Sequence, residues 1–207
     1  MTETLDRHLH DYLDCFTRHG FLFVHIPRTG GTTFERCFGV RCSTFHLRAQ
    51  YCRNLSLCRT EQPVLVAIVR HPYDRMKSVY RFLMSAGSEI DTTLQQDVRR
   101  GRTFESFCVN LPKLLRRHNS VFLWSQWSFL RIEAGPPVDT TLRYERFEHD
   151  IPAFMRTHGL AGNTELPRMR ATGLSDVVIE DTSVARAAIA RWYKTDFDAL
   201  GYSMAAR

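Results

Sequence analysis

The eighteen residues from Phe21 to Phe38, FLFVHIPRTGGTTFERCF, constrain the fold more than any other part of the chain. The run from Phe21 to Ile26 is rich in aromatic and β-branched residues, which is typical of a strand buried on both faces of a parallel sheet. Pro27 ends this strand, and the segment from Thr33 to Phe38 has the composition of a helix that Gly39 terminates. The stretch therefore predicts a strand, a sharp turn and the first turns of a helix.

The turn itself has the residues of an anion-binding site. Gly30 and Gly31 let the backbone approach a ligand closely, and Thr32 and Thr33 add hydroxyl groups where the first helical amides lack partners. Those amides, the positive end of the helix dipole and the charge of Arg28 make phosphate or sulfate the expected occupant. An ordinary strand-to-helix turn is the alternative, but such a turn does not need, within six residues, all of Arg28, Gly30, Gly31, Thr32 and Thr33.

A second buried strand, from Val64 to Val69, leads directly into Arg70-His71-Pro72. These residues follow the carboxyl end of the strand, which is the edge of an open α/β sheet where ligands bind. Pro72 suits the first position of a helix that we expect over residues 73–86. With the Phe21 strand as its parallel neighbour, this strand predicts an α/β fold: a three-layer, P-loop-like domain with a central parallel sheet flanked by helices.

The remaining segments predict elements that complete this domain. We expect helices around 5–16, with Gly20 as the terminating residue, around 46–58, over 147–158 and from Asp181 or Thr182 onward. We expect strands at 40–45, 121–124 and 141–144. Short helices and a loop are expected over 89–119, and a basic loop over 160–180.

Length, charge and hydropathy exclude several classes of protein. The 207 residues, 43% of them hydrophobic, suffice for one well-cored domain over 1–207 and are too few for two ordinary ones. The net charge of +6 comes from basic residues spread along the chain, which favours an anionic ligand over a nucleic-acid-binding arm. No apolar run approaches the roughly 18 residues of a membrane span, and the first residues lack the features of a signal peptide. We therefore expect a soluble, cytoplasmic protein that binds no nucleic acid.

Six cysteines are present, at positions 15, 37, 42, 52, 58 and 108, and none forms a CxxC pair with zinc-ligand spacing. Reduced thiols and no metal site are the expectation for a cytoplasmic chain. A disulfide or a metal site among the four cysteines from Cys37 to Cys58 remains an alternative.

Two motifs, RTGGTT at 28–33 and RHPYDRMKS at 70–78, together resemble the sulfotransferases that use 3′-phosphoadenosine 5′-phosphosulfate (PAPS). The likeness is strongest to the carbohydrate branch that contains the heparan sulfate enzymes. It continues through SQWSFL at 125–130, LRYERF at 142–147 and WYKTDFDALGY at 192–202, and so covers most of the chain. The resemblance implies an enzyme that transfers a sulfuryl group to an acceptor hydroxyl, with a carbohydrate favoured as acceptor, and leaves 3′-phosphoadenosine 5′-phosphate (PAP).

The resemblance also implies roles for individual residues. The residues implied to hold the 5′-phosphosulfate are Arg28, Thr29, Gly30, Gly31, Thr32 and Thr33, and those implied to hold the 3′-phosphate are Arg70 and Ser78, while Arg170 in the basic loop completes the cofactor-binding set. The chemistry agrees, because an arginine at a strand end can fork two N–H donors onto a phosphate.

Arg28 departs from the commoner pattern, since many of these enzymes have lysine there and the tyrosylprotein branch has arginine. Arginine stays charged and can stabilise the leaving phosphate, but it cannot donate a proton as lysine can. We therefore expect an electrostatic catalytic role for Arg28.

A general base should accept the proton of the acceptor hydroxyl, and a histidine near neutral pKa suits this task. Among nine histidines, His46 lies in FHLRAQYCRNL, which looks like the family segment whose histidine precedes a short helix and serves as base. His118 and Glu35 are the reserve candidates.

Other functions stay open at this point. A tyrosine or small-molecule sulfotransferase and a non-catalytic anion- or glycan-binding module both fit the motifs. A P-loop-like nucleotide kinase fits less well, because the turn is not GxxxxGK[ST] and Arg70 stands where an Asp would hold magnesium. The sequence determines neither the acceptor nor the oligomeric state.

Overall fold

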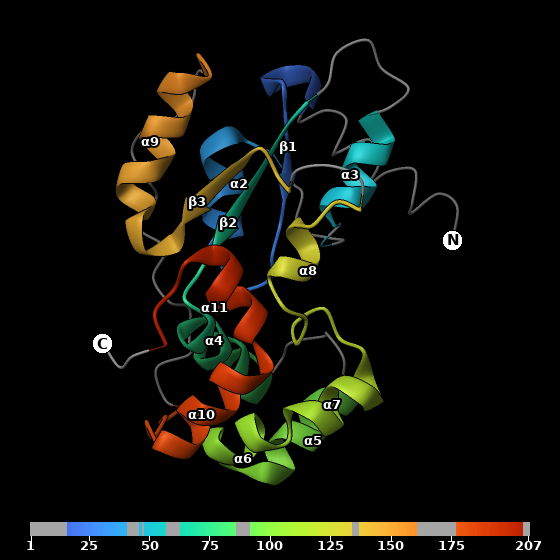
Figure 1. The fold of residues 1–207 in the computed structure, drawn as a ribbon, viewed down its shortest axis with the longest axis vertical. Coiled ribbons are helices and arrows are strands. Elements are labelled where there is room, and N and C mark those ends of the chain that lie inside the picture. The colour runs from blue at the N-terminus through green and yellow to red at the C-terminus, as the bar shows by residue number, and fades with distance from the viewer. Residues whose placement is uncertain are drawn as a thin grey trace. The chain divides into compact units, whose positions relative to one another are not determined.

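The computed structural model of the protein describes residues 16–40, 46, 48–56, 63–85, 92–133, 137–160 and 177–204 (Figure 1). The chain forms two compact units, one of Met1–Arg70 with Ser128–Arg168 and one of His71–Trp127 with Met169–Arg207. That both belong to one domain over 1–207 stays a prediction.

The first unit contains a parallel sheet of three strands in the order β1-β2-β3, namely β1 (Phe21–Val24), β2 (Val64–Val69) and β3 (Thr140–Arg143). Phe21 lies opposite Val64 and Val66 opposite Thr140, so β2 is the central strand. The expected parallel pairing of the strands at 21 and 64 is confirmed. The first strand ends at Val24, two residues earlier than predicted.

Helices flank this sheet. They are α2 (Gly31–Phe38), α3 (Ala49–Ser56) and α9 (Phe147–Thr157), with a 3-10 turn at Tyr144–Arg146, while the short α8 (Trp127–Leu130) spans a boundary between the two units. The Phe21 ring contacts Phe34 and Phe38 of α2 and Phe154 of α9, and Phe23 stacks on Phe34 at 4.3 Å. In Figure 1, α3 lies beyond β1, on the side away from α9, and it contacts both β1 and β2. The α/β fold with a parallel sheet between helices is confirmed.

The second unit is helical where the structure describes it. Its helices are α4 (Pro72–Met84), α5 (Thr92–Gly101), α6 (Phe104–Val109), α7 (Leu111–His118), α10 (Ser183–Trp192) and α11 (Lys194–Leu200). Pro72 occupies the first turn of α4, and the Thr182 side chain caps α10 by accepting from the Ala185 amide, both as predicted. The short helices expected over 89–119 are present as α5, α6 and α7.

Residues 121–124, predicted as a strand, form a turn instead. The buried guanidinium of Arg75 donates to the carbonyls of Trp124 at 2.9 Å and Phe122 at 3.2 Å, and the Tyr193 hydroxyl donates to the Leu123 carbonyl at 2.7 Å. Side chains thus satisfy the backbone groups that a strand partner would otherwise satisfy. The apolar sequence of this segment reflects burial and not pairing in a sheet.

At the amino-terminal side, residues 16–19 are helical and Gly20 ends the helix at φ +70, with its amide donating to the Phe16 carbonyl at 2.7 Å. The rest of that expected helix, the strand expected at 40–45 apart from Val40, and most of the basic loop at 160–180 lie outside the described residues. Among the described helices, none is long and apolar enough to cross a membrane.

Candidate anion-binding and catalytic site

The turn between β1 and α2 has an unusual backbone. Arg28 at φ 68 and Gly30 at φ 91 are both left-handed, and α2 begins at Gly31 without a side-chain cap or an acidic residue in its first turn. The amides of Thr33 and Phe34 donate to the Gly30 carbonyl, at 3.0 and 3.3 Å. Within the described part of the chain, the amides of Gly31 and Thr32 have no acceptor. An open helix start with this dipole favours a bound anion.

Both glycines of the turn are required by close packing. A Cβ on Gly30 would lie 2.9 Å from Cδ2 of Tyr144 and 3.2 Å from Cε2 of Phe147, and the positive φ adds strain. A Cβ on Gly31 would lie 2.3 Å from Nε2 of His25. The His25 ring therefore occupies the space that a side chain at position 31 would need.

The three threonines of the turn differ in what they can reach. Thr29 is fully buried, and its hydroxyl donates to the Ile26 carbonyl at 2.9 Å, which ties the turn to the end of β1. Thr32 is exposed and Thr33 is half-buried. Thr32 and Thr33 thus remain candidates for side-chain contact with a ligand, whereas the Thr29 hydroxyl is already committed inside the turn.

Two arginines lie close together beside the turn. Arg70, which follows β2, donates from Nη1 to the Arg28 carbonyl at 3.4 Å, and its guanidinium lies over the Tyr144 ring, 4.1 Å from the centroid. Burial, and next the positive charge of Arg70, lower the pKa of the Arg28 guanidinium. Arginine stays charged at neutral pH even so. Two positive charges held this close to open amides suit an anion with more than one negative charge.

The carboxyl ends of all three strands supply this site. The Arg28–Gly31 turn follows β1, Arg70 follows β2 and Tyr144 follows β3. The predicted location of ligand binding at this edge of the sheet thus coincides with the place where the structure brings these residues together. Tyr144 was not singled out as a site residue from the sequence, although it is the last residue of the strand predicted at 141–144 and directly follows β3 in the structure.

A chain of hydrogen bonds links three ionisable residues under the turn. Nδ1 of His25 lies 2.9 Å from Oε1 of Glu35, with both side chains 6% exposed, and Nδ1 of His46 lies 2.9 Å from the His25 carbonyl oxygen. The His25 and His46 rings meet edge-on at 4.9 Å. A carbonyl only accepts, so Nδ1 of His46 carries a proton and the neutral ring has its lone pair on Nε2. This is the tautomer in which Nε2 can act as a base.

The reserve candidates for the base are both engaged elsewhere. Glu35 is buried and paired with His25, and His118 is a buried side chain on α7 in the second unit, 2.9 Å from Asp97. Ser78 lies on α4, also in the second unit, and Arg170 lies outside the described residues. The roles of Ser78 and Arg170 therefore stay sequence-based predictions.

The His25–Glu35 pair was not predicted from the sequence.

We expect Gly31→Ala to weaken binding of 3′-phosphoadenosine 5′-phosphate by about tenfold or more, or about 1.4 kcal/mol. The added methyl must displace the His25 ring or shift the turn, because it would sit 2.3 Å from Nε2. Calorimetric titration measures the affinity, and thermal unfolding reports any general damage.

Gly39→Ala is the matched control, at the other end of α2. Gly39 has φ +64, and apart from its own helix backbone and chain neighbours no atom of the described residues lies within 4 Å of the place that a Cβ would take, so alanine adds backbone strain without a collision among those residues. A loss of affinity as large in Gly39→Ala as in Gly31→Ala would contradict the close-packing argument.

A parallel α/β sheet whose strand ends present an open helix start and two arginines is the arrangement expected of a protein that binds phosphate or sulfate esters. Residues 11–203 match the Sulfotransferase family, and the chain belongs to this family. The protein is therefore a sulfotransferase. No curated protein and no solved structure gave a significant match.

Proposed function

We propose that the protein transfers a sulfuryl group from PAPS to a hydroxyl group of a carbohydrate, by in-line transfer without a metal ion, and releases PAP. Members of the family generally use this donor. The observation that carries the proposal is the turn from Arg28 to Thr32, where open amides and two arginines occur together at the carboxyl edge of the sheet. The likeness to the carbohydrate branch supports a sugar hydroxyl as the acceptor.

In this proposal the amides of Gly31 and Thr32 and the guanidinium of Arg28 bind the 5′-phosphosulfate. PAPS supplies the activated sulfuryl group and a phosphate leaving group. As the bond to sulfur breaks, negative charge builds on the leaving phosphate. Fixed donors aimed at that charge stabilise the transition state more than the ground state, which is how they accelerate the reaction.

His46 acts as the general base in the proposed reaction. Its Nδ1–H is held by the His25 carbonyl, which leaves Nε2 to accept the proton of the acceptor hydroxyl. The buried bond between Glu35 and His25 fixes the ring that packs against Gly31 on one side and His46 on the other. Glu35 and His25 thus position the base and the turn without contacting the acceptor.

Arg70 binds the 3′-phosphate of the donor in this proposal. We expect PAP to bind clearly more tightly than AMP, and Arg70→Ala to remove most of the difference, because a charged hydrogen bond contributes about 1.5–3 kcal/mol. Calorimetric titration of both nucleotides into both proteins measures this.

Arg146→Ala is the control for charge alone. Arg146 is an arginine of the same unit, with its side chain 58% exposed and paired with Asp150 at 3.3 Å. If PAP and AMP bind the native protein equally, or if Arg146→Ala removes the preference as fully as Arg70→Ala, Arg70 is not the 3′-phosphate site.

Transfer of radiolabelled sulfate in the presence of EDTA tests the function as a whole. The acceptors compared are an oligosaccharide, a tyrosine-containing peptide and a simple phenol. Label in the oligosaccharide is the expected result. Label only in the peptide or the phenol would show a tyrosine or small-molecule sulfotransferase instead. Activity that requires magnesium would favour the nucleotide-kinase alternative. Nucleotide binding without transfer to any acceptor would favour a binding module.

We also place the protein in the cytoplasm as part of this proposal. Cys37, Cys52 and Cys108 are buried free thiols, and burial raises the pKa of Cys52 and of Cys108 to about 12. Thiols of this kind stay protonated and unreactive, in keeping with a reducing compartment. Cys42 and Cys58 lie outside the described residues, so a role for them stays open.

A further inference from the structure

The aromatic ring of Tyr144 contacts both segments that supply positive charge to the site. The guanidinium carbon of Arg70 lies over the ring, 4.1 Å from its centroid. An edge of the same ring lies against the turn, because a Cβ on Gly30 would come within 2.9 Å of Cδ2 and 3.1 Å of Cε2. The ring therefore joins the residue that follows β2 to the turn that follows β1.

Arg70 also reaches the turn directly. Its Nη1 donates to the Arg28 carbonyl at 3.4 Å, two residues before Gly30. Tyr144, Arg70 and the turn at 28–30 thus form a closed set of contacts, and each of the three strands leads to one member. Because each member touches the other two, a change of the ring would move Arg70 relative to Arg28.

The backbone of Tyr144 is itself held in place. Tyr144 begins the 3-10 turn after β3, and its carbonyl accepts from the Phe147 amide. The preceding amide, of Arg143, donates to Oδ2 of Asp150 on α9 at 3.0 Å. The Tyr144 ring also meets the Phe147 ring edge-on at 6.3 Å. These contacts make the ring a fixed support for the groups that pack on it.

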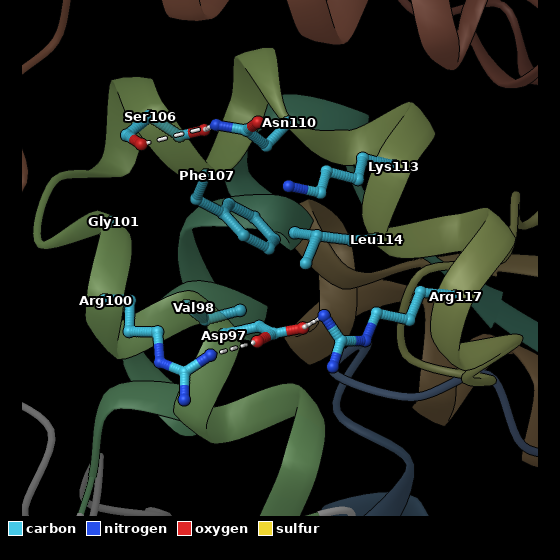
Figure 2. A pocket seen from close by; sticks show the side chains of 10 residues that line it. All are labelled: Asp97, Val98, Arg100, Gly101, Ser106, Phe107, Asn110, Lys113, Leu114 and Arg117. Atoms are coloured by element: carbon cyan, nitrogen blue, oxygen red, sulfur yellow. Dashed lines mark hydrogen bonds and ion pairs between the residues drawn. The ribbon is translucent and has the colours of Figure 1, made fainter.

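Other arginines of the chain are held in a different way. In the hollow among α5, α6 and α7 (Figure 2), Arg100 and Arg117 each form an ion pair with Asp97 at 3.2 Å. A carboxylate offsets the charge of an arginine and occupies some of its N–H donors. An aromatic ring instead attracts the face of the guanidinium, whose donors point outward in its plane. Stacking on Tyr144 therefore holds Arg70 without taking a donor away from an anion.

We propose that Tyr144 is a positioning residue for Arg70. Its ring holds the guanidinium at a fixed place beside the Arg28 turn, in the orientation that binds the 3′-phosphate of the donor. Tyr144 thereby sets the selectivity for a 3′-phosphorylated nucleotide through Arg70. The selectivity rests on the proposed function, whereas the placement of Arg70 does not.

Calorimetric titration of PAP and of AMP into the full chain measures the selectivity as a ratio of two affinities. Tyr144→Leu should lower this ratio about fivefold or more, through weaker PAP binding, because the cation–π contact is lost. Tyr144→Phe keeps the ring and should keep the native ratio. In an Arg70→Ala background, Tyr144→Leu should have no further effect on the ratio, as expected of a residue that acts through Arg70.

Phe147→Leu is the matched control. It removes the other ring beside Gly30, whose Cε2 would lie 3.2 Å from a Cβ there, and leaves the ring on which Arg70 stacks. The ratio of PAP to AMP affinity should stay native in this variant. The proposal is overturned by a native ratio in Tyr144→Leu, by an equal loss in Phe147→Leu, or by a further loss when Tyr144→Leu is added to Arg70→Ala.

NMR relaxation of the Arg70 Nε–H group, measured without nucleotide, separates this proposal from the proposed function. The signal is identified by its absence from Arg70→Ala. It should report an ordered side chain in the native chain and in Tyr144→Phe, and a mobile one in Tyr144→Leu. Equal order in the native chain and in Tyr144→Leu would overturn the proposal. Loss of order in Tyr144→Leu, with equal binding of PAP and AMP by the native chain, would support the placement of Arg70 and overturn its proposed role at the 3′-phosphate alone.

Discussion

Replacing Arg28 with alanine should lower kcat/KM for sulfuryl transfer by roughly 10³ or more, because loss of one preorganised donor to a developing charge typically costs 10²–10³ in kcat and donor affinity falls in addition. Arg28 contacts the ground-state phosphosulfate in our account, and its charge is needed most as the leaving phosphate becomes more negative. Steady-state kinetics and calorimetric titration with PAP separate the two effects, and both should be impaired.

Arg28→Lys retains the charge but loses the planar fork of donors, so it should recover part of the lost activity. Arg36→Ala, an exposed change on the same helix, should leave both kcat and donor affinity near their native values. If Arg28→Ala leaves PAP affinity and kcat unchanged, Arg28 does not bind the phosphosulfate and the turn is a structural feature only.

His46→Ala should impair the reaction in a different way from Arg28→Ala. If His46 is the general base, this change should lower kcat by roughly 10² or more and leave PAP affinity nearly unchanged, because a general base acts on the acceptor and not on the bound donor. The hydrogen bond from Nδ1 to the His25 carbonyl supports this role, because it places the lone pair of the neutral ring on Nε2. Kinetics at saturating donor and acceptor, beside a PAP titration, provide the measurement.

Near-normal turnover of His46→Ala under saturation would show that the base lies elsewhere, and Glu35 and His118 would be tested next. Both are engaged in the structure, Glu35 with His25 and His118 with Asp97. Glu35→Gln is informative in either case. If Glu35 only positions His25, the Glu35→Gln enzyme should have a lower kcat but still contain the general base, so the pH profile of its kcat should keep its acidic limb.

The strands and the glycine turn could be predicted from the sequence because local residue pattern determines them. Continuous apolar runs at Phe21 and Val64 indicate strands buried on both faces, and such strands occur in parallel sheets between helices. A glycine pair just after such a strand marks a close approach of backbone to ligand or to neighbouring side chains. In the structure, the His25 and Tyr144 rings are those neighbours.

Contacts between distant segments could not be predicted in this way. The Tyr144 ring lies under Arg70 and against Gly30, although these residues are far apart in the sequence, and only the β1-β2-β3 order brings them together. The strand prediction at 121–124 was wrong for the same reason, because contacts with distant residues determine the structure of this segment. Its apolar residues pack in the second unit while Arg75 and Tyr193 satisfy its carbonyls.

A crystal structure of the protein with bound PAP tests the central claim most directly. We predict oxygens of the 5′-phosphate within about 3.2 Å of the Gly31 and Thr32 amide nitrogens and of the Arg28 guanidinium, and the 3′-phosphate within the same distance of Arg70. Density for PAP away from the turn, or a 3′-phosphate that does not contact Arg70, would contradict the account.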